Sequence, residues 1–141
     1  MRMHKILLVL GIGTFCSCNL FCTQAPAKPL TDMQKQALTD ANNALAALKT
    51  LKITQILPSR QKIMAAQYAI HSERKTNLLP LEKRANGLLE TFRQASEKLI
   101  GTKERQNLID ARTKIFTEYE AALKNARSSI WKQDVAAAPT E

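Results

Sequence analysis

The chain has 141 residues, of which 45% are hydrophobic and 5% aromatic, and its formal net charge is +9. This length fits one domain and excludes an assembly of two independent domains. The apolar residues are mainly leucine, isoleucine and alanine, which favour helices over sheets. We therefore expect one all-α domain with few turns.

The first residues have the form of a secretory signal peptide. Arg2 and Lys5 make the start basic, and residues 6–15 are an apolar run without a charge. This order is typical of an export signal, and the run is shorter than the roughly 20 residues that a membrane span needs. We expect an exported protein, located in the periplasm or anchored to a membrane as a lipoprotein.

Two cleavage patterns compete after the apolar run. Ala-Pro-Ala at residues 25–27 fits cleavage after Ala27, which makes residues 1–27 the signal peptide. Phe-Cys-Ser-Cys at residues 15–18 resembles a relaxed bacterial lipobox, with Cys18 as the candidate for lipidation, although Phe15 stands where that pattern has an aliphatic residue. Both routes remain open from the sequence.

All three cysteines, Cys16, Cys18 and Cys22, belong to this same segment. If the chain is cut after Ala27, no cysteine is left to form a disulfide in the folded domain. Its stability must then come from side-chain packing.

The first predicted helix covers residues 31–54 and begins with a capping box. Thr31 is placed to cap the helix, Gln34 follows three residues later, and Asp32 suits the positive end of the helix dipole. Apolar residues then recur at spacings of three and four and predict one buried face, formed by Leu38, Ala41, Leu45 and Leu48. We expect this helix to end before Pro58.

A second helix is predicted over residues 59–76, with Ser59 as its cap. Pro80 is expected to break or to kink the chain, because its ring clashes with the preceding turn and its nitrogen has no hydrogen to donate. One long bent helix over residues 59–100 is the alternative.

The third predicted helix has the most regular apolar pattern. Residues 81–100 carry a heptad seam that predicts packing against a second helix at a shallow angle; its members are Leu81, Ala85, Leu88, Phe92, Ala95 and Leu99. Gly101 suits the position that follows a helix end.

The fourth predicted helix covers residues 103–132, with Thr102 as its cap. Four apolar residues recur at intervals of seven and are expected to face the core: Ile109, Phe116, Leu123 and Ile130. Asp110 with Lys114, and Glu120 with Lys124, have the spacing of ion pairs on an exposed helix face.

Together these segments predict an elongated antiparallel helical bundle of three to four helices over residues 28–134. Residues 135–141 have little to bury and are expected to be a disordered tail. If the bundle leaves one apolar stripe uncovered, a homodimer would cover it.

The sequence contains no recognisable catalytic constellation. His71 is the only histidine after residue 27, and it lies among the charged residues of segment 72–75. The Glu-x-x-His pairs of di-iron bundles and the Cys-x-x-Cys-His site of attached haem are both missing from the sequence. A haem held by Met33 and His71 is a minor alternative. We expect no enzyme activity, no cofactor and no metal site.

The basic excess points to an anionic partner. Loss of Arg2 and Lys5 with the signal lowers the net charge from +9 to +7. Six basic residues form a candidate patch for such a partner, namely Arg60, Lys62, Arg74, Lys75, Lys83 and Arg84. Acidic proteins or a membrane surface would suit this patch, whereas nucleic acid is not expected because the chain has no motif that binds bases. An ordinary solvated basic face is the alternative.

Two short stretches resemble a known family. Leu-Thr-Asp-Met-Gln-Lys-Gln at residues 30–36 resembles the LTxxQ motif of the Spy/CpxP family of periplasmic stress proteins, and residues 100–106 resemble a degraded second copy. The resemblance covers these stretches and the general architecture. It implies helical hairpins that dimerise into a cradle and bind unfolded or envelope proteins without ATP.

We therefore expect an exported, non-enzymatic helical protein that binds other envelope proteins, as a chaperone or stress protein. The alternative is a structural or host-interacting lipoprotein that serves as a spacer or adaptor.

Overall fold

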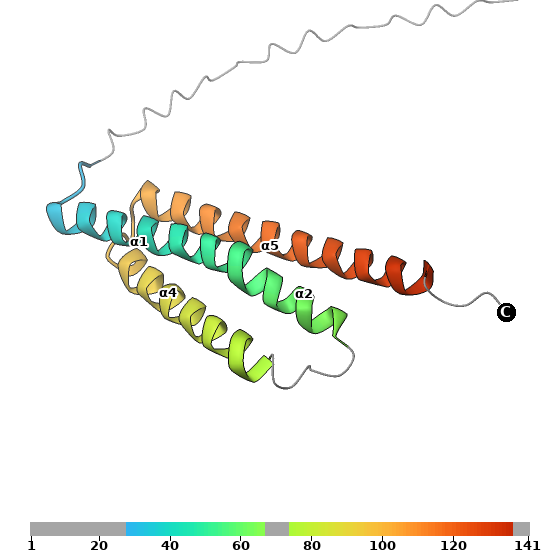
Figure 1. Ribbon diagram of the computed structural model, residues 1–141. Coiled ribbons are helices and arrows are strands. Elements are labelled where there is room, and N and C mark those ends of the chain that lie inside the picture. The colour runs from blue at the N-terminus through green and yellow to red at the C-terminus, as the bar shows by residue number, and fades with distance from the viewer. Residues whose placement is uncertain (1–27, 67–73, 137–141) are drawn as a thin grey trace, which may run out of the picture.

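The structure, a computed structural model, describes residues 28–66 and 74–136 (Figure 1). Within these ranges every regular element is helical, so the all-α prediction is confirmed. The elements are the α-helices α1 (Asp32–Leu51), α2 (Leu57–Ala65), α4 (Leu79–Glu97) and α5 (Lys103–Ala136), and the π-helical turns η1 (Lys52–Ile56) and η2 (Arg74–Leu78). The signal segment with Cys18, and His71, lie outside the described residues.

Helix α1 begins with the predicted capping box. The Gln34 backbone N–H donates to Thr31 Oγ1 at 3.2 Å, and the Thr31 N–H donates to Gln34 Oε1 at 3.0 Å. These reciprocal bonds satisfy donors that have no partner inside the first turn of a helix. Of the predicted face, Ala41, Leu45 and Leu48 are buried, and Leu38 is half-buried against the same core.

The expected end of this helix before Pro58 is wrong. The chain stays helical from Asp32 to Ala65, and Pro58 is the second residue of α2. In η1 the Leu57 N–H donates to the Lys52 carbonyl, five residues earlier. A π turn widens the helix at this point, so a proline without a donor is tolerated where an ordinary α-helical turn would be broken.

A second π turn followed by a proline begins 22 residues later in the chain. Residues 52–58 (Lys-Ile-Thr-Gln-Ile-Leu-Pro) and 74–80 (Arg-Lys-Thr-Asn-Leu-Leu-Pro) share a basic residue, a threonine, an amide, an aliphatic residue and Leu-Pro at equal positions. Each forms a π turn followed by an α-helix with proline in its first turn. Helical structure therefore continues through Pro80, so of the two predicted outcomes there, a break or a kink, the break is wrong.

The interruption between the second and third predicted helices lies earlier. Helix α2 ends at Ala65, and Ala66 has an extended backbone with φ −85° and ψ 122°. The predicted helix over residues 59–76 and the alternative of one helix over residues 59–100 are therefore both wrong. Helical structure resumes at Arg74, after residues 67–73, which the structure does not describe.

A tight turn joins α4 to α5. Gly101 has φ +83°, in the left-handed region that favours glycine. The Arg105 N–H then donates to Thr102 Oγ1 at 3.3 Å, which confirms Thr102 as the cap of α5. Helix α5 continues to Ala136, two residues into the segment predicted as a tail; residues 137–141 lie outside the described part.

The two described glycines are expected to respond oppositely to alanine. Gly87 lies in an exposed part of α4, and a Cβ atom there would meet no atom within 4 Å. Gly87→Ala should therefore raise the free energy of unfolding by about 0.5–1 kcal/mol. Gly101→Ala should lower it by about 1–2 kcal/mol, because a Cβ atom strains the left-handed backbone. Urea denaturation of both variants checks this, and shifts of equal sign would contradict it.

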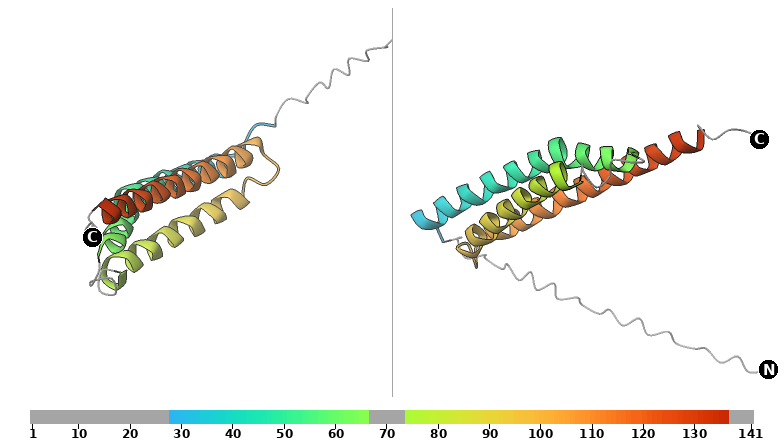
Figure 2. Two further views of the ribbon diagram at one scale, coloured as in Figure 1. Left: turned by 90° about the vertical axis from the view of Figure 1, so that its right-hand side faces the viewer. Right: turned by 60° about the horizontal axis from the view of Figure 1, so that its bottom comes forward.

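Helix α1 packs against both α4 and α5. Figures 1 and 2 show α1 and α5 running in one direction and α4 in the other. Small residues of α1 allow α4 to approach closely, and Ala37, Ala41 and Ala44 are all buried. Helices α4 and α5 approach each other less closely than α4 approaches α1, although Phe92 of α4 and Ile115 of α5 belong to one core cluster. We call the side on which α4 and α5 face each other the open side.

Most of the predicted seam of residues 81–100 is buried, whereas the buried row of α5 is not the predicted one. Ala85, Phe92 and Ala95 of α4 are buried, as is Leu99 in the turn after it, and Leu81 and Leu88 are half-buried. In α5, the buried residues are Leu108, Ile115 and Tyr119, and the predicted core residues Ile109, Phe116, Leu123 and Ile130 are only half-buried. The buried row packs on α1 and α2. In the half-buried row, Phe116 and Leu123 pack partly against the same core.

Candidate functional site

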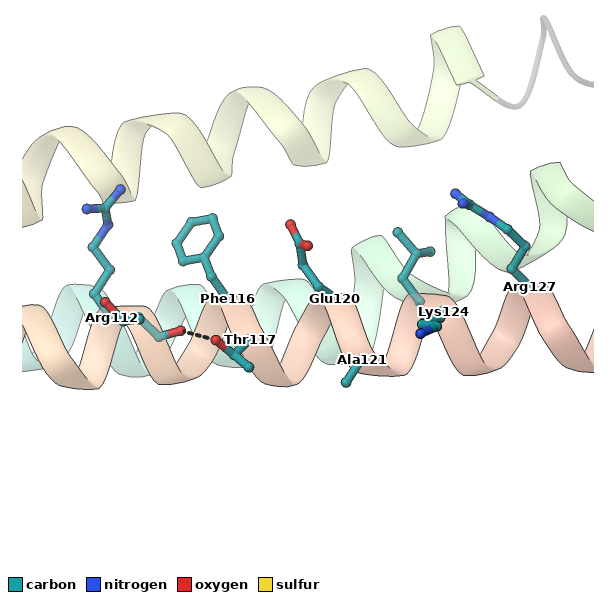
Figure 3. Close-up of a pocket in the computed structure, with 9 residues that line it drawn as sticks. Arg112, Phe116, Thr117, Glu120, Ala121, Lys124 and Arg127 are labelled. Carbon is teal, nitrogen blue, oxygen red and sulfur yellow. Dashed lines mark hydrogen bonds between the residues drawn. The ribbon is translucent and has the colours of Figure 1, made fainter.

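The open side of the molecule holds a series of hollows along α5. The central hollow has a volume of about 860 Å³ and is lined by residues of α5 alone. Figure 3 shows Arg112, Phe116, Glu120 and Arg127 pointing from α5 toward α4, while Ala121 points away. The half-buried stripe of α5 thus forms the apolar floor of a groove.

Two further hollows extend this groove in both directions. One, of about 440 Å³, lies between α4 and the start of α5 and shares Arg112 with the central hollow. The other, of about 200 Å³, lies where α2, η2 and α5 meet and shares Leu123 and Arg127 with it. We call the surface that lines the three hollows the α4/α5 groove.

The groove carries an excess of positive charge. Arg60 pairs with Glu82 at 2.6 Å, and Arg93 pairs with Glu90 at 2.7 Å. In contrast, three arginines of α5 form no ion pair within the described residues: Arg105, Arg112 and Arg127. The Nε atom of Arg105 is enclosed and has no hydrogen-bond partner there. The surface is therefore suited to accept negative charge.

The side chain of Phe116 is the aromatic centre of the floor. The Arg112 guanidinium carbon lies 5.4 Å from its ring centroid, and Lys52 Nζ lies 4.5 Å from it. Both distances are within the range of cation–π attraction. The ring therefore helps to hold two positive charges close together beside the groove.

A partly buried polar cluster lies beside this ring. Lys52, the first residue of η1, also lies 4.4 Å from the ring centroid of Tyr119. Burial, and after it the charge of Arg60, lowers the pKa of Lys52 below its usual value of 10.5. Burial also raises the pKa of the Tyr119 hydroxyl. The π turn thus places the Lys52 side chain in a partly buried position close to the positive charge of Arg60.

Tyr119→Phe tests the energetics of this cluster. Tyr119 Oη is buried and has no hydrogen-bond partner among the described residues, and an unpaired buried hydroxyl costs stability. The variant is expected to raise the free energy of unfolding by about 1 kcal/mol, measured by urea denaturation. Tyr119→Ala, which removes the ring too, should be destabilising. A loss of stability in Tyr119→Phe would show that the hydroxyl is bonded.

The structure places the six residues of the predicted basic patch in different surroundings. Arg60 and Arg74 line the groove where α2, η2 and α5 meet. Arg84 lies on another side, in a hollow with Gln55 and residues of α1. The remaining three, Lys62, Lys75 and Lys83, are exposed side chains outside the hollows described above.

Sequence reasoning missed the basic residues of α5. The signal in the sequence was their spacing. Arg105 and Arg112 are seven residues apart and lie on the same helix face as Phe116. The predicted pairs of Asp110 with Lys114 and of Glu120 with Lys124 are not among the ion pairs of the described residues. Glu120 is exposed, and its side chain points toward α4 (Figure 3).

The described residues offer no metal-binding cluster of three or more histidine, cysteine, aspartate or glutamate side chains. None of the described helices has both the length and the apolar character needed to cross a membrane. Comparison of the chain with protein families, with curated proteins and with solved structures finds no match.

Proposed function

We propose that this chain is an exported, non-enzymatic protein that binds other envelope proteins, as an ATP-independent chaperone or stress protein related to the Spy/CpxP family. In this proposal it acts as an elongated antiparallel helical bundle with one open side. The α4/α5 groove is the observation that carries the proposal, because it combines half-buried apolar residues with unpaired arginines.

The chemistry of binding would have two parts. Arg112 and Arg127 attract an acidic protein over distances of about a Debye length, near 10 Å at moderate salt. Contact with Phe116 and Leu123 then removes apolar surface from water on both partners. Several apolar side chains elsewhere are also exposed and could add contacts: Met33, Leu79, Ile100 and Trp131.

An aggregation assay tests the proposal. The mature chain, added in stoichiometric amounts to a reduced and denatured acidic protein, is expected to lower the light scattering of the aggregating sample. The effect should weaken as salt rises, because screening shortens the reach of the arginine charges. An equal amount of a neutral helical protein serves as the control. If the mature chain does not lower the light scattering at low salt, the proposed chaperone function is wrong.

A lipoprotein that serves as a spacer or adaptor is the second candidate, favoured by the 34-residue length of α5. Mass spectrometry of the native N-terminus separates the two processing routes. An acylated Cys18 would support an anchored spacer, whereas an unmodified start at Lys28 would support a free periplasmic protein.

A further inference from the structure

We propose that the α4/α5 groove binds one amphipathic, acidic helix of a partner protein. This inference rests on the proposed protein-binding function and adds to it the shape and charge of the partner segment. In this arrangement the partner helix lies along α5 on the side that faces α4.

The dimensions of the groove suit a helix. Its central part is lined by α5 alone, and α4 contributes residues to the two hollows at its ends. From Arg105 to Arg127 the groove follows 22 residues of α5, which is about 33 Å at the rise of an α-helix. A partner helix of about six turns would therefore contact its full length.

The apolar floor has the spacing that a helix recognises. Ile109, Phe116 and Leu123 follow one another at intervals of seven, and each is half-buried. A partner with apolar residues at heptad spacing would pack into this row, as one helix packs along another.

The charges of the groove select an acidic partner. Arg105, Arg112 and Arg127 are separated by seven and fifteen residues, or about 10 Å and 22 Å along α5. Carboxylates at the same separations on the partner helix would face all three arginines. Glu120 is the acidic side chain of the central hollow, so positive charge dominates there.

The other occupants fit less well. A second copy of the chain would bring the same arginines against each other, which is unfavourable in a symmetric interface. Residues 1–27 contain basic residues and no aspartate or glutamate, and residues 137–141 are only five residues with a proline. A flat membrane surface would touch the rims of the groove and leave its floor uncovered.

A designed peptide tests the inference. The probe is a fluorescent helix of about six turns with leucines at heptad positions and glutamates seven and fifteen positions apart. A peptide of equal composition with permuted order is its control. By fluorescence anisotropy with the full mature chain, the designed peptide is expected to bind at least tenfold more tightly than the permuted one.

Matched variants of α5 locate the binding site. Arg112→Glu with Arg127→Glu should weaken binding of the designed peptide at least tenfold. Lys114→Glu with Lys132→Glu makes the same charge change on exposed side chains about half a turn away from the groove, and should weaken binding less than threefold. A peptide with lysines in place of its glutamates should bind the groove variant better than it binds the unchanged protein.

Four results would overturn the inference. The first two are equal binding of the designed and permuted peptides, and an equal loss of peptide binding in the two charge-reversed variants. The third is a homodimer, detected by sedimentation, that only the groove variant (Arg112→Glu with Arg127→Glu) dissociates. The fourth is binding to phosphatidylglycerol vesicles that only the groove variant loses, while that variant still binds the peptide. If the designed peptide does not bind but the chain suppresses aggregation, only the inferred helical partner is rejected. If the chain does not suppress aggregation but the peptide binds, only the chaperone function is rejected.

Discussion

Leu99→Ala is expected to lower the free energy of unfolding by about 2–5 kcal/mol. The Leu99 side chain is fully buried at 0% exposure, within a cluster that joins α1, α4 and α5 and includes Phe92 and Leu108. Truncation removes apolar contacts and leaves a cavity where the turn between α4 and α5 meets α1. Urea denaturation followed by circular dichroism at 222 nm measures the loss.

The neighbouring residue is a matched control for this change. Ile100 is 66% exposed and lies in the same turn. Ile100→Ala should change the free energy of unfolding by less than about 0.5 kcal/mol, as is usual at exposed positions. Equal losses in the two variants would mean that the turn is not packed as the structure has it.

Glu82→Ala is expected to lower the free energy of unfolding by about 1–2 kcal/mol, through loss of its ion pair with Arg60. This ion pair joins α2 to α4. The Glu82 side chain is 32% exposed and the Arg60 side chain is 40% exposed. Solvent screening keeps the loss below the range for a fully buried pair. Arg60 Nε has no partner among the described residues, so removal of Glu82 leaves the guanidinium poorly satisfied.

A double-mutant cycle isolates this interaction. With Arg60→Ala, Glu82→Ala and the double variant, the expected coupling energy is about 1 kcal/mol. The pair of Lys35 with Asp32, whose carboxylate side chain is 100% exposed, provides the control cycle and should show no measurable coupling. A coupling energy as small for the first pair as for the control would contradict a structural role of the first pair.

The features that were predictable from sequence depend on local chemistry. The reciprocal bonds of Thr31 and Gln34 follow from their spacing alone, and so does the turn at Gly101 with its cap Thr102. The seam of α4 was predictable too, because its apolar residues repeat without a competing stripe.

The features that were not predictable depend on partners distant in sequence. Helix α5 has two adjacent apolar rows, one through Leu108 and Ile115 and one through Ile109 and Phe116, and only packing on α1 and α2 decides which is buried. The α4/α5 groove arises from the same choice. Pro58 was a misleading stop signal because a π turn precedes it, although its similarity to the segment around Pro80 was visible in the sequence.

The common direction of α1 and α5 has a consequence for a tethered molecule. Both helices begin at the same end of the structure, where residue 28 also lies (Figure 1). The 34 residues of α5 carry its carboxyl-terminal end about 50 Å from there. If Cys18 carries a lipid, the anchor is attached at the amino-terminal end, and the exposed Trp131 lies toward the opposite end of α5.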